Sequence, residues 1–342
     1  MPAAEAGFFP LDRQLELGRE GWSPGLARDV VWLSGALPSL GLVREALVRL
    51  GGPPLALSTI WNQVQKAGRR FRAWEEEERA QGQQLGEPER PGEAERSSSV
   101  RLGVALDGAL VHIREEGWKE LKVGVVFQVE AIAGREGGRA VQPTYVAHLG
   151  GPEVLGEKVW AEARRRGWEQ VPETLVLGDG AAWIWNQAAL HFGTSRQVVD
   201  WWHAKAHLTA AGRLLYPEGS AALTHWLQSR EERLYQGGAP QIAQELAMRA
   251  AQKGANSSEL TQAATYFRTH QARMQYRTVR TQGWPIGSGV VESGAKQFKA
   301  RLCGPGMRWS RSGAQHMVAL RAAVLSQRFD PIWNAAVNSP PF

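Results

Sequence analysis

The chain has 342 residues, of which 43% are hydrophobic and 22% charged, a balance typical of folded globular domains rather than of disordered chains. It contains no run of 18 apolar residues, so we expect no transmembrane helix and predict a cytoplasmic protein without a membrane partner. One cysteine, Cys303, excludes an internal disulfide and a cysteine zinc site. The net charge of +6 favours a polyanionic partner.

Residues 1–74 are predicted to form a small helical domain. Apolar residues recur at helical spacing within 26–33 and 42–50, and a third helix is expected over 58–71, with Ser58 as its N-cap. Two helices separated by a short glycine-containing break are the outline of a helix-turn-helix, although any small helical bundle shares it. On the third helix, the residues expected to contact DNA are Thr59, Asn62, Gln63, Lys66, Arg69 and Arg70.

Residues 75–99 are predicted to be an acidic, flexible linker. Between Glu75 and Val100 there are eight Glu and three Arg, together with Gly, Pro and Ser, and no apolar periodicity.

An α/β core is predicted to begin at residue 100. Buried strands are expected over 101–113, 121–133 and 143–149, followed by a helix, a short strand over 174–180 and a second helix. Three strands, helix, strand, helix is the order of a ribonuclease H-like core, which has a mixed sheet with flanking helices. The core is expected to occupy 100–202 and 285–342, interrupted over 203–284 by an insertion of amphipathic helices.

Three carboxylates are candidate metal ligands because of their positions in these elements. Asp107 and Asp179 each end a predicted strand and precede a glycine, and Glu292 follows the turn formed by residues 287–289. If the three converge, they repel one another unless a divalent cation lies between them, and such oxygen ligands suit two Mg²⁺ or Mn²⁺ ions. Two ions of this kind support in-line phosphoryl displacement. The structural alternatives are a turn at each Asp-Gly and a favourable charge of Glu292 near a helix N-terminus.

Basic residues are concentrated at the C-terminal end. From Thr265 to Phe342 there are eleven Lys or Arg against two acidic residues, a net charge of +9. Those that flank Glu292 are predicted to bind phosphates beside a scissile bond, the alternative being a solvated helix face. They are Lys296, Lys299, Arg301, Arg308 and Arg311.

The stretches around the three carboxylates resemble bacterial insertion-sequence DDE transposases of the ISKra type. The segment WPIGSGVVESGAKQFKARLCGPGMRWS is similar to the family's signature around its catalytic glutamate, LVLGDGAAWIWNQA to the second aspartate and VALDGALVHIR to the first. The segment DWWHAKAHL resembles the Asp-x-x-His element of Mutator-like transposases and places Asp200 and His203. The resemblance implies metal-dependent cleavage and strand transfer of transposon ends into target DNA, by an oligomer assembled on DNA.

Asp200 and His203 have two open interpretations. The resemblance implies that they support the active site or contact DNA, whereas local chemistry also allows helix capping by Asp200 and packing by His203. His203 and His207, four residues apart, have a spacing that can bind zinc, although no third ligand lies nearby in the sequence. Trp183, Trp185, Trp201 and Trp202 can either fill the core or stack on unpaired bases.

Two further functions compete with the transposase. A shortened copy can act as a DNA-binding regulator without catalysis, and a ribonuclease H-like nuclease can cut without strand transfer. Intact Asp107, Asp179 and Glu292 argue against the regulator, and the helical insertion argues against the plain nuclease.

Overall fold

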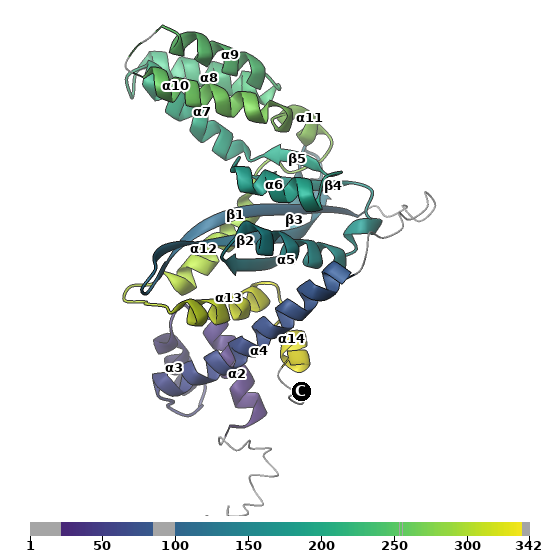
Figure 1. Ribbon diagram of the computed structural model, residues 1–342, viewed down its shortest axis with the longest axis vertical. Helices are drawn as coiled ribbons and strands as arrows, with labels where there is room; N and C mark the ends of the chain where they lie inside the picture. Colours follow the sequence, from purple (N-terminus) through teal and green to yellow (C-terminus); the bar gives the residue numbers. More distant parts are fainter. Residues whose placement is uncertain (1–21, 85–99, 253, 255, 337–342) are drawn as a thin grey trace, which may run out of the picture. The chain divides into compact units, whose positions relative to one another are not determined.

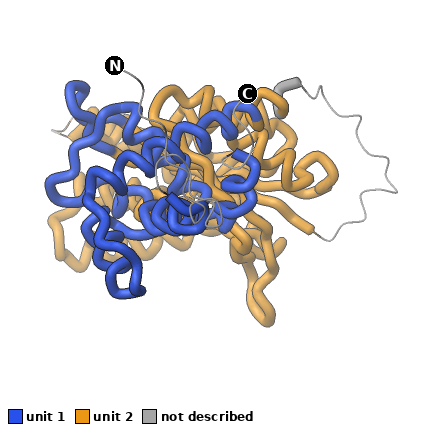
Figure 2. Tube along the Cα trace, turned by 90° about the horizontal axis from the view of Figure 1, so that it is seen from below, with its two compact units in different colours: residues 1–77, 111–119, 298–342 blue, residues 78–110, 120–297 orange. Residues whose placement is uncertain are grey.

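The computed structural model describes residues 22–84, 100–252, 254 and 256–336. By its internal contacts the chain divides into two compact units, each assembled from separated stretches of sequence (Figure 2). Unit 1 comprises Met1–Glu77, Val111–Lys119 and Phe298–Phe342, and unit 2 comprises Glu78–Leu110 and Glu120–Gln297. No described helix is long and apolar enough to cross a membrane.

Unit 2 is built on a mixed five-stranded sheet (Figure 1). The strand order is β3-β2-β1-β4-β5, with β1 parallel to β4, β4 parallel to β5, and β2 antiparallel to β3. The strands are rich in Val and Leu, which suit a pleated surface with both faces covered. Their bounds are Arg101–Ile113 (β1), Gly117–Ala131 (β2), Gly138–Leu149 (β3), Thr174–Gly178 (β4) and Arg196–Val199 (β5). The predicted α/β class and mixed sheet are thereby confirmed.

Helices cover both faces of this sheet. Gly124 and Tyr145 lie on opposite faces, because Gly124 pairs with Val146 and Tyr145 with Val125. A Cβ on Gly124 would lie 2.3 Å from Val159 of α5 (Pro152–Arg165), so α5 packs on the first face. On the other face the Tyr145 hydroxyl donates to the carbonyl of Val290 (3.1 Å) in α12 (Gly289–Leu302). The helix that carries Glu292 is thus attached to the sheet.

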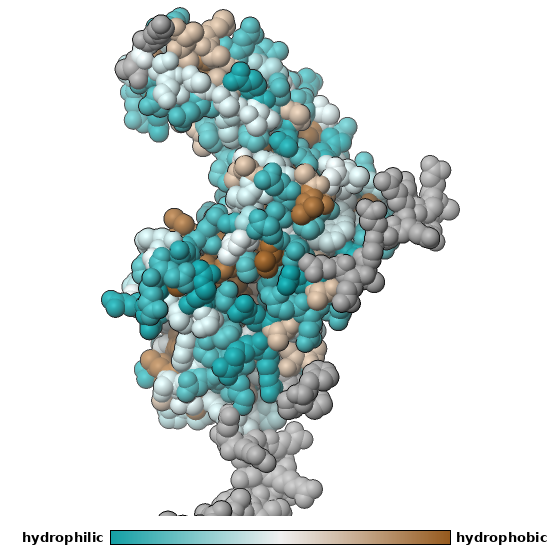
Figure 3. All heavy atoms as spheres, viewed as in Figure 1, coloured by the Kyte–Doolittle hydropathy of each residue, from teal (hydrophilic) through white to brown (hydrophobic). Residues whose placement is uncertain are grey.

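Further helices of unit 2 follow β4 and β5. The insertion of amphipathic helices expected over 203–284 is represented by α7 to α11, and in it α10 packs on α7 and α9, and α8 packs on α7. The visible face of this insertion is mostly hydrophilic (Figure 3), as amphipathic helices require. The bounds are Ala182–His191 (α6), Trp201–Leu215 (α7), Ala221–Tyr235 (α8), Ala239–Ala250 (α9), Ser257–His270 (α10) and Tyr276–Thr281 (α11), with 3-10 turns at Trp168–Gln170 (η2) and Gln271–Arg273 (η3).

Unit 1 joins the N-terminal helices to the C-terminal ones. Its helices are α2 (Pro24–Ala36), α3 (Leu40–Arg49), the part of α4 (Leu57–Gln84) up to Glu77, α13 (Arg311–Leu325) and α14 (Phe329–Ala336). α13 packs against α2, and Phe71 of α4 contacts Phe329 and Trp333 of α14, at ring-centroid distances of 5.3 and 6.4 Å.

Three boundaries differ from the expectations. α4 continues to Gln84, ten residues into the expected linker, because Glu, Arg and Gln favour helices and Arg79 forms an ion pair with Glu157 of α5. It begins at Leu57, so Ser58 lies in its first turn instead of capping it. Residues 50–56 separate α3 from α4, a longer connection than the usual helix-turn-helix turn of about three to four residues. The expected linker beyond Gln84 lies outside the described residues up to Val100.

The predicted second part of the core, 285–342, is divided between the units. Residues up to Gln297 contact the sheet, whereas residues from Phe298 group with the N-terminal helices. The apolar faces of α13 and α14 are buried against α2 and α4, which a local hydrophobic pattern does not reveal.

Two glycines provide a test of how closely α4 and α13 pack. A Cβ on Gly68 would lie 2.5 Å from Cβ and 3.0 Å from Cα of His316, whereas a Cβ on Gly25 in α2 would meet nothing within 4 Å. We expect Gly68→Ala to lower the free energy of unfolding by about 1–3 kcal/mol through overpacking. The same change at Gly25 should raise it by up to ~1 kcal/mol through helix propensity. Urea denaturation of both variants measures the difference, and equal shifts would contradict the close packing.

A candidate metal centre beside three parallel strands

The register of the parallel strands brings three aspartates to the same level. Ala105 of β1 pairs with Leu177 of β4, and Gly178 of β4 pairs with Val199 of β5. Continuing this register by one or two residues aligns Asp107 with Asp179, and Asp179 with Asp200. The backbone N–H of Asp200 donates to the carbonyl of Gly178 (2.8 Å), which maintains the alignment at its far end.

Asp107 lies in the electrostatic field of the other carboxylates. Burial raises the pKa of Asp107, and the charges of Asp179 and Glu292 raise this pKa further. The backbone N–H of Gly108 donates to Asp107 Oδ1 (2.7 Å) and, together with His203, acts in the opposite direction. The charges of Asp179 and Glu292 thus act on Asp107. Among the described residues, however, the group of side chains close enough to share one cation is Asp200, His203 and Glu292, so Asp107 and Asp179 are not part of it.

Asp179 is fixed by the helices that follow it. Its Oδ1 accepts from the N–H of Ala181 (2.8 Å), just before α6, and its backbone carbonyl accepts from the hydroxyl of Tyr266 in α10 (3.2 Å). Gly180 has φ +107°, and a Cβ there would lie 2.8 Å from the Tyr266 ring, so this tight turn requires glycine. Burial and the charges of Asp179 and Asp200 raise the pKa of Tyr266, which therefore stays a neutral hydrogen-bond donor.

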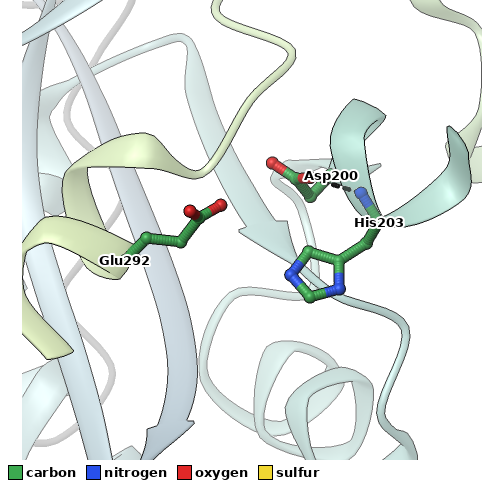
Figure 4. A group of neighbouring side chains, drawn as sticks. All are labelled: Asp200, His203 and Glu292. Atoms are coloured by element: carbon green, nitrogen blue, oxygen red, sulfur yellow. Dashed lines mark hydrogen bonds between the residues drawn. The ribbon is translucent and has the colours of Figure 1, made fainter. Parts of the chain in front are cut away.

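Glu292 projects from the first turns of α12 toward Asp200 and His203 (Figure 4). One ligand atom from each of these three residues lies within 4.8 Å of the others, close enough for one cation. The hydroxyl of Ser288 donates to Glu292 Oε1 (3.3 Å). Lys296, one turn further along α12, has its ammonium 4.0 Å from Glu292 Oε2 and an 80% exposed side chain.

Asp200 is completely buried and both of its oxygens accept backbone hydrogen bonds. Oδ1 caps α7 by accepting from the N–H of His203 (2.8 Å), and Oδ2 accepts from the N–H of Ser288. The neighbouring N–H of Trp201 donates to the carbonyl of Ile286 (2.9 Å). Asp200 therefore ties the start of α7 to the loop that leads into α12, and capping is part of its role.

Four of the five basic residues predicted to bind phosphate lie in unit 1: Lys299, Arg301, Arg308 and Arg311. Lys299 and Arg308 are exposed, and Arg311 forms an ion pair with Glu116 (2.6 Å). Arg301 is only 2% exposed, and its Nε donates to the carbonyl of Ser34 (2.8 Å) at the end of α2. The expectation that Arg301 binds phosphate is thus corrected, because its guanidinium is enclosed in unit 1.

Five of the six α4 residues predicted to contact DNA line one cavity of unit 1. This cavity, called the α4 hollow below, has a volume of about 440 Å³ and is lined by Trp22 and by residues of α4. The α4 residues include Thr59, Asn62, Gln63, Lys66 and Arg69, while Arg70 is partly exposed on the same helix. The structure thus gathers these side chains around a concave surface.

His207 and the tryptophans near the site are mostly in packing contacts. His207 is stacked on Tyr266, with ring centroids 3.7 Å apart, and is not in the cation-compatible group found among the described residues. Trp185 is buried, and Trp201 contacts Tyr276 (4.8 Å), as core packing predicts. Trp202 is 62% exposed, and its Nε1 is 3.4 Å from the position of a Cβ on Gly287 in the loop before α12.

Sequence reasoning missed two residues that organise the site, Ser288 and Tyr266. Ser288 stands four residues before Glu292, and this spacing on a helix start was an available signal. Tyr266 carries no local signal, because its contact with Asp179 spans 87 residues.

The chain has a distant similarity to a known protein. No protein-family model matches the chain. The chain is 22% identical over 346 aligned residues to a UPF0236 protein in the vanSb 3′ region of Streptococcus gallolyticus, and the alignment covers 99% of this chain and 71% of that protein. The similarity thus extends through both units.

Proposed function

We propose that this protein is a DDE transposase that cleaves DNA and transfers strands at the site formed by Asp107, Asp179 and Glu292. The observation that carries the proposal is the parallel register of β1 and β4, which sets the two aspartates level at one place beside the sheet. The effect of Asp179 and Glu292 on the pKa of Asp107 supports the convergence of all three carboxylates. The strand order β3-β2-β1-β4-β5 with flanking helices supports a ribonuclease H-like core.

The donor set fits hard divalent cations. The charges of Asp179 and Glu292 act unfavourably on the charged form of Asp107, and a bound cation would offset this repulsion; oxygen ligands suit Mg²⁺ or Mn²⁺. Asp107, Asp179 and Glu292 would hold two such ions, and the imidazole of His203 lies close enough to Glu292 to share a cation with it (Figure 4). When bound, the ions polarise phosphoryl oxygens and lower the pKa of an attacking water or 3′-hydroxyl.

The surrounding residues position this site and attract the substrate. Asp200 holds the N-terminus of α7 and the loop before α12, so the imidazole of His203 and the carboxylate of Glu292 keep their separation. The exposed ammonium of Lys296 offers a positive charge to a phosphate beside Glu292. Transposon ends and target DNA are the proposed partners, and bringing two ends together requires an oligomer on DNA.

Labelled DNA that carries the element's own terminal repeats tests the proposal. Wild-type protein with Mg²⁺ or Mn²⁺ should give cleaved and then joined products, and Glu292→Gln should give neither while still binding DNA. Cleaved products without joining would indicate a nuclease. Specific binding without cleavage by either protein would contradict catalysis and favour a DNA-binding regulator.

A further inference from the structure

The surface of α4 that lines the α4 hollow is concave. A helix that reads duplex DNA instead protrudes into the major groove. Thr59, Asn62, Gln63 and Lys66 stand at positions i, i+3, i+4 and i+7 of α4, in a row separate from the buried row that begins at Ile60. A recognition helix inserts such a row into the major groove. Here the row is one wall of a cavity that also includes Trp22, before the start of α2. Such a surface receives a group from its ligand.

The chemistry of the lining fits one nucleotide. A tryptophan ring offers a stacking surface for any base, and the amides of Asn62 and Gln63 match the donor and acceptor edges of bases. Lys66 and Arg69 supply cations for a phosphate, and the lining residues found among those described include no carboxylate. The volume of about 440 Å³ falls within the range of roughly 300–1,000 Å³ usual for small-ligand sites.

The positive field of the hollow extends into the helix interface behind it. Nδ1 of His316 in α13 forms a hydrogen bond with Oε1 of Gln65 (2.7 Å), and Gln65 also lines the hollow. Burial lowers the pKa of His316, and the charges of Arg72 and Arg69 lower it further. The arginine charges therefore act on a neighbouring side chain, as expected of a site that attracts an anion.

We propose that the α4 hollow binds one unpaired nucleotide of DNA, with its base against Trp22 and the amides of Asn62 and Gln63, and its phosphate at Lys66 and Arg69. This inference rests on the proposed function only in taking DNA as the substrate. The binding itself requires neither a metal ion nor the carboxylates of unit 2.

The test uses the full chain in EDTA, so that no cleavage occurs, and fluorescence anisotropy with two labelled DNAs. One is a blunt duplex, and the other is the same duplex with a three-nucleotide single-stranded overhang. We expect wild-type protein to bind the overhang DNA about 10-fold more tightly, since stacking and edge contacts favour an unpaired base. Trp22→Ala and Asn62→Ala should each remove most of this preference, because each should weaken the complex with the overhang DNA much more than the complex with the blunt duplex.

Two controls separate the hollow from general effects. Gln244→Ala removes an exposed amide from α9 and should keep the full preference. Lys66→Gln should weaken both complexes and reduce the salt dependence of binding. A preference that survives both Trp22→Ala and Asn62→Ala, or an equal loss on both DNAs, overturns the inference. A retained overhang preference in a protein that never cleaves DNA contradicts only the proposed catalysis.

Discussion

Asp179→Asn should abolish DNA cleavage and at the same time stabilise the metal-free protein. Losing one carboxylate from the metal centre should cost at least about 4 kcal/mol of transition-state stabilisation, which is about 10³-fold in rate. The amide oxygen can still accept from the N–H of Ala181, so the start of α6 keeps its support. One negative charge is removed from the field that acts on Asp107, which relieves repulsion in the absence of metal.

A loss of activity together with a gain in stability distinguishes a metal ligand from a residue that supports the fold. Melting temperatures in EDTA should be higher than that of wild type for both Asp179→Asn and Asp107→Asn. Addition of Mg²⁺ should raise the melting temperature of wild type and raise that of the variants much less, because ligand binding stabilises in proportion to RT ln(1 + [L]/Kd). Variants that unfold earlier in EDTA would show that the aspartates serve the fold. Equal responses to Mg²⁺ would show that they hold no metal.

Asp200→Asn is expected to have the second large effect, on stability and activity together. The side chain of asparagine can accept at one position only, so either the N–H of His203 or that of Ser288 would face another donor. Loss of a helix cap costs about 0.5–2 kcal/mol, and a buried N–H without a partner about 1–3 kcal/mol. Because only one of these two hydrogen bonds is lost, we expect a loss of about 1–3 kcal/mol in the free energy of unfolding, measured by urea denaturation in EDTA.

A matched cap in the same unit controls for general destabilisation. Ser220 caps α8 through a single hydrogen bond to the N–H of Leu223 (3.1 Å), so Ser220→Ala should cost only about 1 kcal/mol and leave cleavage unchanged. Asp200→Asn should also reduce cleavage at saturating Mg²⁺, because the loop before α12 no longer holds Glu292. If Asp200 acted only as a metal ligand, the loss of stability would be seen with Mg²⁺ and not in EDTA.

Local patterns in the sequence were sufficient to predict the strands and to place Asp179 directly after β4, which is a short apolar run followed by Asp-Gly. The expectation that Asp107 also ends a strand was wrong, because β1 continues through Asp107 and Gly108 to Ile113. The pairing of β1 with β4 was not predictable from these patterns, since it joins residues about 70 positions apart. The same limit applies to Asp200 and Ser288, which lie 88 residues apart and meet only after the sheet and α12 have assembled.

Arg301 shows where charge alone gave the wrong expectation. It follows Phe298 by three positions on α12 and precedes Leu302, both of which are buried, so its helical phase places it on the packed face. Lys296 and Lys299 point away from that face and are exposed. Helical phase, considered before charge, would have separated the buried arginine from the two exposed lysines.

The buried arginines of unit 1 have a consequence for the synthesis of the chain. Arg301 and Arg321 donate to the carbonyls of Ser34, Gly35 and Ala36, the last residues of α2. The arginine donors are synthesised more than 260 residues after these carbonyls. The apolar faces of α2 and α4 likewise have no packing partner until the C-terminal helices have been made. The nascent N-terminal segment therefore leaves the ribosome with exposed apolar surface, which favours chaperone binding or aggregation until translation is nearly finished.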